Sequence, residues 1–296
     1  MHELTTPYLV NNDKNQLKFY YKIKVSCFVE NVLLPEGEFC SRGKNISQFC
    51  SLLTFLAVQL ETEVVSCSPV SRVLELEGGK QTVAGSEVVC ADTVLFPEGG
   101  GQNTDRGSIN SVPVLSVSRR GTEAVHLVSP AVDWRPGDLV TQRLDWGRRW
   151  DNMQQHSGQH LLSAILEKEH NTNTLSWWMA ESHPAKVGVS YIELDRAVSS
   201  EVERKVSERC NALITAATPV TVQTLSVGDP KLEAAHTRGL PDDHTGPVRV
   251  VTIGEVDTNL CCGTHVSNTS QLQVLHLMGS ESKVGRYTRL VFEDDN

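Results

Sequence analysis

The sequence predicts an α+β protein made of a small β-barrel domain followed by a mixed α+β domain. Two observations lead to this prediction. Short β-branched or alternating segments, interrupted by glycine and proline, occupy the chain from about residue 59 to residue 146. Beyond residue 150, apolar residues recur every three or four positions, which is the period of a helix. A chain of 296 residues is also long enough to form two domains.

The first predicted domain covers residues 58–147. It contains strand-like segments such as Glu61–Val70, Ser111–Arg120 and Asp138–Trp146. About six or seven such segments in under roughly 90 residues are typical of a small barrel or a sandwich, and we predict the barrel.

The second predicted domain covers residues 148–296. Its first helix is expected over Trp150–His170. A second helix is expected to begin at a capping box formed by Ser200 and Glu203 and to end before Pro219. Strands are expected at residues 186–194, 219–227, 246–254, 272–278 and 287–292, which predicts helices packed on a largely antiparallel sheet.

Residues 1–57 differ from the rest of the chain. They are rich in Asn and Lys at first, then aromatic, and they contain no cluster of chemically active side chains. We assign no role to this segment and expect the core activity to survive without it.

Composition limits the possible partners. The net charge of −9 argues against a general electrostatic grip on nucleic acid, and we predict no DNA partner. The basic residues Arg119, Arg120, Arg143, Arg148 and Arg149 are interpreted as surface charge. The longest apolar run, residues 50–58, falls short of the ~20 residues that span a membrane, so we predict no membrane partner and a cytoplasmic location. Protein partners cannot be named from the sequence.

The eight cysteines form no disulfide pattern, and six of them are scattered and interpreted as small buried apolar residues. Cys261 and Cys262 are different because Gly263 and His265 follow them. A glycine there allows the chain to turn, so that either cysteine could approach His265.

A second pair of candidate ligands lies on the first helix. His156 and His160 are four residues apart, which places both imidazoles on one face. Together with His265 and either Cys261 or Cys262 they would form a His₃Cys set, whose commonest occupant is Zn²⁺, at one ion per chain. Spacing alone does not choose between the two cysteines.

Three motifs, in order, give the chain a recognisable resemblance. They are "PEGGGQNTDRG" (97–107), "HSGQH" (156–160) and "CCGTHV" (261–266). Together they resemble the AlaX-type freestanding alanyl-tRNA editing proteins, most of all the vertebrate-type cytosolic members, over about residues 60 to 292. The family pattern C-x-x-x-H implies that Cys261 and His265 are the ligands and that Cys262 stands where the family often has glycine, pointing away from the ion as a small apolar side chain.

The resemblance also implies an activity. Such proteins are zinc-dependent hydrolases that deacylate mischarged tRNA(Ala), chiefly Ser-tRNA(Ala), and they bind its acceptor end. By this resemblance Gly100, Gly101 and Gln102 would close over the aminoacyl-adenosine, and Thr174 or Ser176 would recognise the seryl hydroxyl. We assign no catalytic residue beyond the metal ligands.

Two other interpretations remain. Four protein ligands make a closed zinc site of the kind that is usually structural, so the domain could be a non-catalytic module that binds tRNA or a protein. The chain also has some similarity to the editing domain of threonyl-tRNA synthetases, although the Gly-rich segment ahead of the helix favours the alanyl branch.

Overall fold

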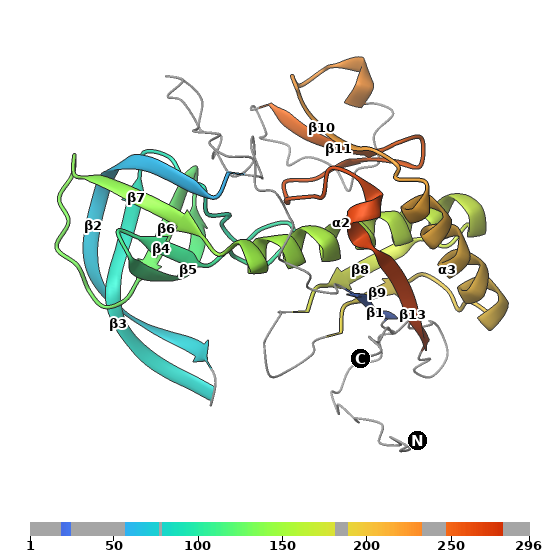
Figure 1. Cartoon of the computed structure of the whole chain (residues 1–296), viewed down its shortest axis with the longest axis horizontal. Helices are drawn as coiled ribbons and strands as arrows, with labels where there is room; N and C mark the ends of the chain where they lie inside the picture. Colours follow the sequence, from blue (N-terminus) through green and yellow to red (C-terminus); the bar gives the residue numbers. More distant parts are fainter. Residues whose placement is uncertain (1–18, 25–56, 77–78, 181–188, 233–246, 281–296) are drawn as a thin grey trace.

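The computed structural model describes residues 19–24, 57–76, 79–180, 189–232 and 247–280 (Figure 1). Among them, no helix is at once long and apolar enough to cross a membrane. The predicted strand at residues 287–292 and three of the scattered cysteines (Cys27, Cys40 and Cys50) lie outside the described residues. Of the other three, Cys210 is fully buried in a hydrophobic core, as predicted, and Cys67 and Cys90 pack partly buried against another.

Six strands close on themselves into the predicted barrel. Their order around the barrel is β2-β3-β6-β5-β4-β7, and β7 pairs back with β2 to complete it. Apolar residues that face inward on alternate positions, among them Val64, Val88 and Val114, form its core. The strands are β2 (Gln59–Leu76), β3 (Gly79–Cys90), β4 (Gly107–Ile109), β5 (Val112–Arg120), β6 (Glu123–Val128) and β7 (Leu139–Leu144).

One polar cluster interrupts this apolar interior. The His126 imidazole is fully buried, with Nδ1 2.9 Å from the Val88 carbonyl oxygen and Nε2 2.8 Å from Thr93 Oγ1. Because a carbonyl only accepts, Nδ1 must carry a proton. Burial lowers the pKa of His126 to about 4, so the ring is neutral in the folded protein at neutral pH.

We therefore expect His126 to make the fold sensitive to acid. In the unfolded chain its pKa is near 6.5, so protonation favours unfolding as the pH falls from about 6.5 to about 4. The shift corresponds to a loss of about 3 kcal/mol in the free energy of unfolding, complete below pH 4 and absent above pH 6.5. Urea unfolding of the unmodified protein and of His126→Asn across this range measures it. Between pH 6.5 and pH 4, the free energy of unfolding of the variant should fall by about 3 kcal/mol less than that of the unmodified protein. An equal fall in both proteins would contradict the role given to His126.

The second part of the chain is built on two α-helices. Helix α2 (Trp146–His170) runs from the edge of the barrel into this part, and α3 (Ser200–Thr215) packs against it (Figure 1). Apolar side chains from both helices, including Leu162 and Val206, form a second core. The two separate cores support the predicted division at residues 147 and 148, which stays a prediction.

Among the described residues, the strands of this part form three small antiparallel sheets rather than the one largely antiparallel sheet that we predicted. These sheets have the orders β8-β9, β10-β11-β12 and β1-β13. Strand β12 was not expected, because its sequence, DTNL, is mostly polar. The strands are β8 (Thr174–Trp178), β9 (Tyr191–Leu194), β10 (Val220–Leu225), β11 (Val248–Ile253), β12 (Asp257–Leu260) and β13 (Val274–Ser280), with short 3-10 turns η2 (Pro230–Leu232) and η3 (Thr269–Leu272).

Strand β1 (Phe19–Lys24) comes from the N-terminal segment to which we assigned no role. It pairs antiparallel with β13 near the opposite end of the chain, with Lys22 opposite His276. Its backbone also lies close to β9 and α2. Deleting residues 1–57 would therefore remove a strand, and this weighs against our prediction that the segment is dispensable.

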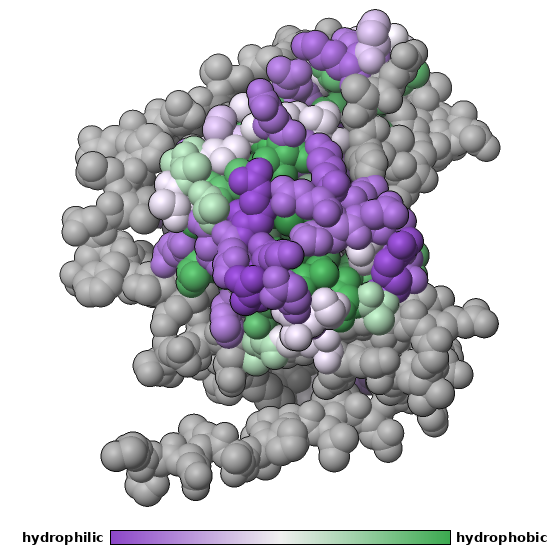
Figure 2. Space-filling model, turned by 90° about the vertical axis from the view of Figure 1, so that its right-hand side faces the viewer, coloured by the Kyte–Doolittle hydropathy of each residue, from purple (hydrophilic) through white to green (hydrophobic). Residues whose placement is uncertain are grey.

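Both helices begin slightly earlier than predicted. Asp145 caps α2, and its carboxylate accepts the Arg148 main-chain N–H at 3.2 Å, so the helix starts four residues before Trp150. Ser199 caps α3 by accepting the Val202 N–H, so the predicted cap at Ser200 is wrong by one residue. The side of the molecule that carries α3 is largely hydrophilic (Figure 2), in agreement with exposed ion pairs such as Arg209–Glu169.

Candidate metal centre

The structure brings four predicted ligands into one cluster. His156 and His160 project from one face of α2, while Cys261 and His265 lie in the turn that follows β12. One donor atom from each of the four residues lies within 4.8 Å of every other. The three histidines are buried and Cys261 is half-buried.

The separations suit a tetrahedral ion. Cys261 Sγ lies 3.4 Å from His156 Nε2 and 3.3 Å from His265 Nε2. Zn–N bonds of about 2.0–2.1 Å and a Zn–S bond of about 2.3 Å place a nitrogen and a sulfur ligand roughly 3.5 Å apart across a tetrahedral edge. The donor set therefore fits such an ion in both chemistry and spacing.

Each histidine also has a polar neighbour on its other ring nitrogen. His156 Nδ1 lies 2.9 Å from Gln102 Oε1, and His265 Nδ1 lies 3.0 Å from Ser157 Oγ. His160 Nδ1 faces the Asp257 carboxylate at 3.5 Å, which is an ion-pair distance rather than a hydrogen bond. This arrangement, with Nδ1 engaged and Nε2 directed inward, is the usual outer shell of a histidine-ligated metal.

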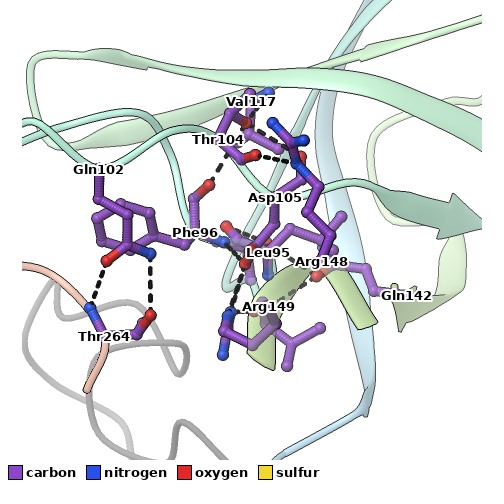
Figure 3. A network of polar contacts seen from close by, with 12 residues as sticks. Leu95, Phe96, Gln102, Thr104, Asp105, Val117, Gln142, Arg148, Arg149 and Thr264 are labelled. Atoms are coloured by element: carbon purple, nitrogen blue, oxygen red, sulfur yellow. Dashed lines mark hydrogen bonds and ion pairs between the residues drawn. The ribbon is translucent and has the colours of Figure 1, made fainter. Parts of the chain in front are cut away.

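For His156 the protonation state follows from main-chain geometry. The Thr264 N–H can only donate, and it donates to Gln102 Oε1 at 2.8 Å, so that atom is the amide oxygen. An oxygen without a hydrogen can only accept from His156, so Nδ1 carries the proton and the Nε2 lone pair faces Cys261. Gln102 Nε2 donates to Thr264 Oγ1 at 2.9 Å, which leaves the whole amide group engaged (Figure 3).

The electrostatics favour the metal-binding form of most of these groups. Burial alone would raise the pKa of the Cys261 thiol, but the three surrounding imidazoles lower it well below its ordinary value. Burial lowers the pKa of His156 and holds that of His265 well below its ordinary value. A thiolate and neutral imidazoles are the forms that bind a metal.

Glycines allow the Gly-rich loop to lie directly against this cluster. An ideal Cβ on Gly100 would sit 2.7 Å from Cys262 Sγ, and one on Gly101 would sit 2.6 Å from the Trp177 ring. Both glycines also have positive φ angles, which residues with side chains adopt only rarely. The space beside these two glycines is thus occupied by protein side chains, while the glycines themselves remain exposed.

The turn that carries the candidate ligands also needs a glycine. A Cβ on Gly263 would lie 2.1 Å from His156 Cε1, which is too close for any side chain at position 263. Cys262 points toward Gly100 and is not a member of the four-residue cluster. The cluster therefore includes Cys261 and not Cys262, and the assignment of Cys261 as a metal ligand stays a prediction.

The beginning of α2 is tied to the loop that carries Gln102 (Figure 3). The Arg149 guanidinium is fully buried and pairs with the buried Asp105 carboxylate, which also accepts the Phe96 N–H at 2.7 Å. Arg149 Nη2 donates to the Val94 carbonyl at 2.8 Å, and Arg148 Nε donates to the Thr104 carbonyl at 2.8 Å. The prediction that these two arginines are surface charge is wrong, because both anchor the helix to the barrel.

The two residues proposed to recognise the seryl hydroxyl lie on β8. Thr174 Oγ1 donates to Ser163 Oγ at 2.8 Å, and Ser163 belongs to α2. The Ser176 hydroxyl donates to the buried Glu193 carboxylate on β9. Ser163 lies within about 60° of His156 and His160 around the helix axis, so Thr174 packs on the metal-bearing face of α2.

Sequence reasoning missed several residues of the centre. Four residues contact the candidate ligands or their neighbours from distant segments. Ser157 contacts His265, and Asp257 faces His160. Thr264 contacts Gln102, and Arg249 contacts the carbonyl of Cys261. Only Ser157 and Thr264 carried a usable signal, since they sit next to the histidines in the two short motifs.

Comparisons with known proteins identify a matching family and several similar proteins. Residues 248–291 match a family described as the threonyl and alanyl tRNA synthetase second additional domain. The chain is 46% identical over 237 residues to the alanyl-tRNA editing protein Aarsd1-B of Xenopus laevis, covering 80% of this chain and 56% of that protein. It is 46% identical to mouse Aarsd1 over 238 residues, again 80% of this chain and 56% of the relative. It is 35% identical over 266 residues to a putative alanyl-tRNA editing protein alaX of Saccharomyces cerevisiae, covering 82% of this chain and 57% of the relative.

The chain thus spans little more than half the length of these relatives. The matched region includes most of the described residues, and the sequence identity is high for vertebrate relatives. Over the matched region this chain is similar to AlaX-type alanyl-tRNA editing proteins, including their vertebrate members.

Proposed function

We propose that this protein is a zinc-dependent hydrolase that removes the wrong amino acid, chiefly serine, from mischarged tRNA(Ala). The observation that carries the proposal is the buried His₃Cys cluster, whose donor separations suit a tetrahedral ion, next to the exposed main chain of Gly100 and Gly101. The names of the relatives support the same class of substrate. A cytoplasmic location is part of the proposal.

The ligands would be His156, His160, Cys261 and His265, holding one Zn²⁺ per chain. Three imidazoles and one thiolate form a borderline-soft donor set for which zinc is the commonest occupant. When bound, the ion can polarise an ester carbonyl, lower the pKa of a water molecule or position the substrate.

The chain's own residues prepare the site around these ligands. Gln102 fixes the proton of His156 on Nδ1 and joins the Gly-rich loop to the ligand turn through Thr264. The exposed main chain of Gly100 and Gly101 offers a surface without side chains that an aminoacyl-adenosine can approach closely. Trp177 lies against Gly101, with its ring centroid 5.0 Å from that of His156, and forms one wall beside the cluster.

Selectivity for serine over alanine requires recognition of one hydroxyl group. Thr174 already donates its proton to Ser163, so its oxygen would act as acceptor for a seryl hydroxyl. Alanine would leave that acceptor unpaired, at a cost of about 1–3 kcal/mol, which is roughly 5- to 150-fold in rate. Between our two candidates, the contact with the metal-bearing face of α2 favours Thr174 over Ser176.

We therefore expect Thr174→Val to lower the ratio of Ser-tRNA(Ala) to Ala-tRNA(Ala) hydrolysis by about 5-fold or more, with metal content unchanged. Valine keeps the shape of threonine and removes only the hydroxyl. Ser176→Ala is the matched comparison, because it removes a hydroxyl from the same strand. A larger loss of selectivity in Ser176→Ala would reverse the assignment of the two residues.

One observation favours a second candidate function. Four protein ligands complete a tetrahedral coordination, as in structural zinc sites, so the same fold could serve as a non-catalytic module that binds tRNA or a protein. In that case zinc would stabilise the fold without supporting hydrolysis.

A deacylation assay separates these possibilities. Ser-tRNA(Ala) and Ala-tRNA(Ala), each labelled in the amino acid, are incubated with metal-depleted protein and with protein restored with zinc. The proposed hydrolase releases serine much faster than alanine and only when zinc is restored. Zinc-bound protein that hydrolyses neither ester would support the non-catalytic module, and equal hydrolysis of both would contradict a proofreading role.

A further inference from the structure

The turn that carries Cys261 is held by a guanidinium group from a neighbouring strand. Arg249 lies on β11, and its Nη1 donates to the carbonyl of Cys261 at 2.8 Å and to that of Gly263 at 2.6 Å. A main-chain bond adds to this contact, since the Cys261 N–H donates to the Arg249 carbonyl at 3.2 Å. Arg249 thus contacts both ends of the three-residue turn.

The conformation of this turn makes such a donor necessary. The Gly263 N–H points at Cys261 Sγ at 3.4 Å, while the carbonyls of residues 261 and 263 both accept from Arg249. Carbonyl groups buried without a partner cost free energy, and a single main-chain N–H could not reach both. The Nη1 amino group of Arg249 carries two hydrogens and donates to both at once.

Arg249 also brings positive charge to the thiolate. The guanidinium remains charged under all ordinary conditions, because an arginine in a protein does not lose its proton. The geometry therefore places one fixed cation against the turn that carries Cys261.

We propose that Arg249 is a positioning residue of the metal centre: it holds the Cys261–Gly263 turn in the shape that presents the sulfur to the ion, and its charge offsets that of the thiolate. The inference rests on the proposed metal centre. It predicts that Arg249 sets metal affinity and the electronic character of the sulfur ligand.

Three substitutions separate the two contributions. R249K keeps a charge and several donors, R249Q keeps a donor without the charge, and R249M removes both. Arg209→Gln is the matched control, because Arg209 is an exposed arginine of α3 that pairs with Glu169 of α2. Zinc affinity is measured by competition with a chelator on the full chain, and folding is followed by circular dichroism.

We expect R249M to weaken zinc binding by about 10- to 100-fold, the usual effect of removing an outer-shell partner, with R249K close to the unmodified protein. Cobalt(II) in place of zinc reports on the sulfur through its thiolate-to-metal charge-transfer band. Loss of the nearby cation raises the energy of the sulfur lone pair, so this band should move to longer wavelength in R249Q and stay in place in R249K. A purely structural role would not shift the band.

The outcomes are distinct. If R249M binds zinc as tightly as the unmodified protein, or if R249Q leaves the cobalt band unchanged, the inference about Arg249 is wrong while the metal centre stands. If the unmodified protein binds neither zinc nor cobalt, the proposed metal centre itself fails. Should R249M not fold, the comparison of R249Q with R249K decides the question, because equal affinity and equal spectra in that pair would contradict a role for the charge.

Discussion

Replacing Cys261 with alanine is expected to remove the metal from the protein, whereas replacing Cys262 is not. Cys261 Sγ lies within 3.4 Å of two ligand nitrogens, while Cys262 points toward Gly100. Loss of a direct ligand should weaken zinc binding by more than the roughly 100-fold that loss of an outer-shell partner costs. Metal analysis after gel filtration, with deacylation of Ser-tRNA(Ala) in parallel, checks the result.

The adjacent cysteine provides the control. Cys262→Ala removes a thiol of the same size one residue away, so nonspecific effects of losing a cysteine are matched. We expect it to retain one zinc per chain and to lose about 1 kcal/mol or less of stability from the small gap left beside Gly100. Loss of zinc from Cys262→Ala, with retention in Cys261→Ala, would exchange the roles of the two residues.

Breaking the buried ion pair between Arg149 and Asp105 is expected to cause the largest loss of stability. Both side chains are fully buried, so Arg149→Met leaves the Asp105 carboxylate in a region of low polarity without its partner. Such a change typically costs about 3–5 kcal/mol in the free energy of unfolding. Denaturation in urea, followed by circular dichroism, gives this value directly.

Two further variants test the cause. Adding Asp105→Asn to Arg149→Met removes the stranded charge and should recover part of the lost stability. Arg209→Gln breaks an exposed pair with Glu169 and should cost no more than about 1 kcal/mol. An Arg149→Met variant as stable as the unmodified protein would show that the pair does not hold α2 to the barrel.

The features that depend on local sequence were predictable. Alternating apolar residues specified the barrel strands, and the spacing of His156 and His160 placed both on one helix face. His265 was a candidate from its position after the tandem cysteines, but the choice of Cys261 over Cys262 required the family resemblance, because these residues meet the helix across more than 100 positions of chain. No periodicity carries information over such a separation.

The outer parts of the site were not predictable for a related reason. Arg149 looks like a surface residue in the sequence, and only the fold reveals that Asp105 is buried beside it. The same holds for Asp257 next to His160, and for β1, which pairs with a strand from the far end of the chain. These contacts are set by tertiary packing, which overrides local preference.

The close packing of Gly100 against Cys262 has a consequence for how this site can change during evolution. The side chain at position 262 fills the volume that a side chain at position 100 would need, so only one of the two positions can carry a side chain in that volume. In the same way, the Trp177 ring fills the volume that a side chain at position 101 would need. Substitutions in the barrel loop and in the ligand turn are therefore expected to occur together: a larger residue at position 100 needs position 262 to be reduced to glycine first, and it must also adopt the positive φ angle of Gly100.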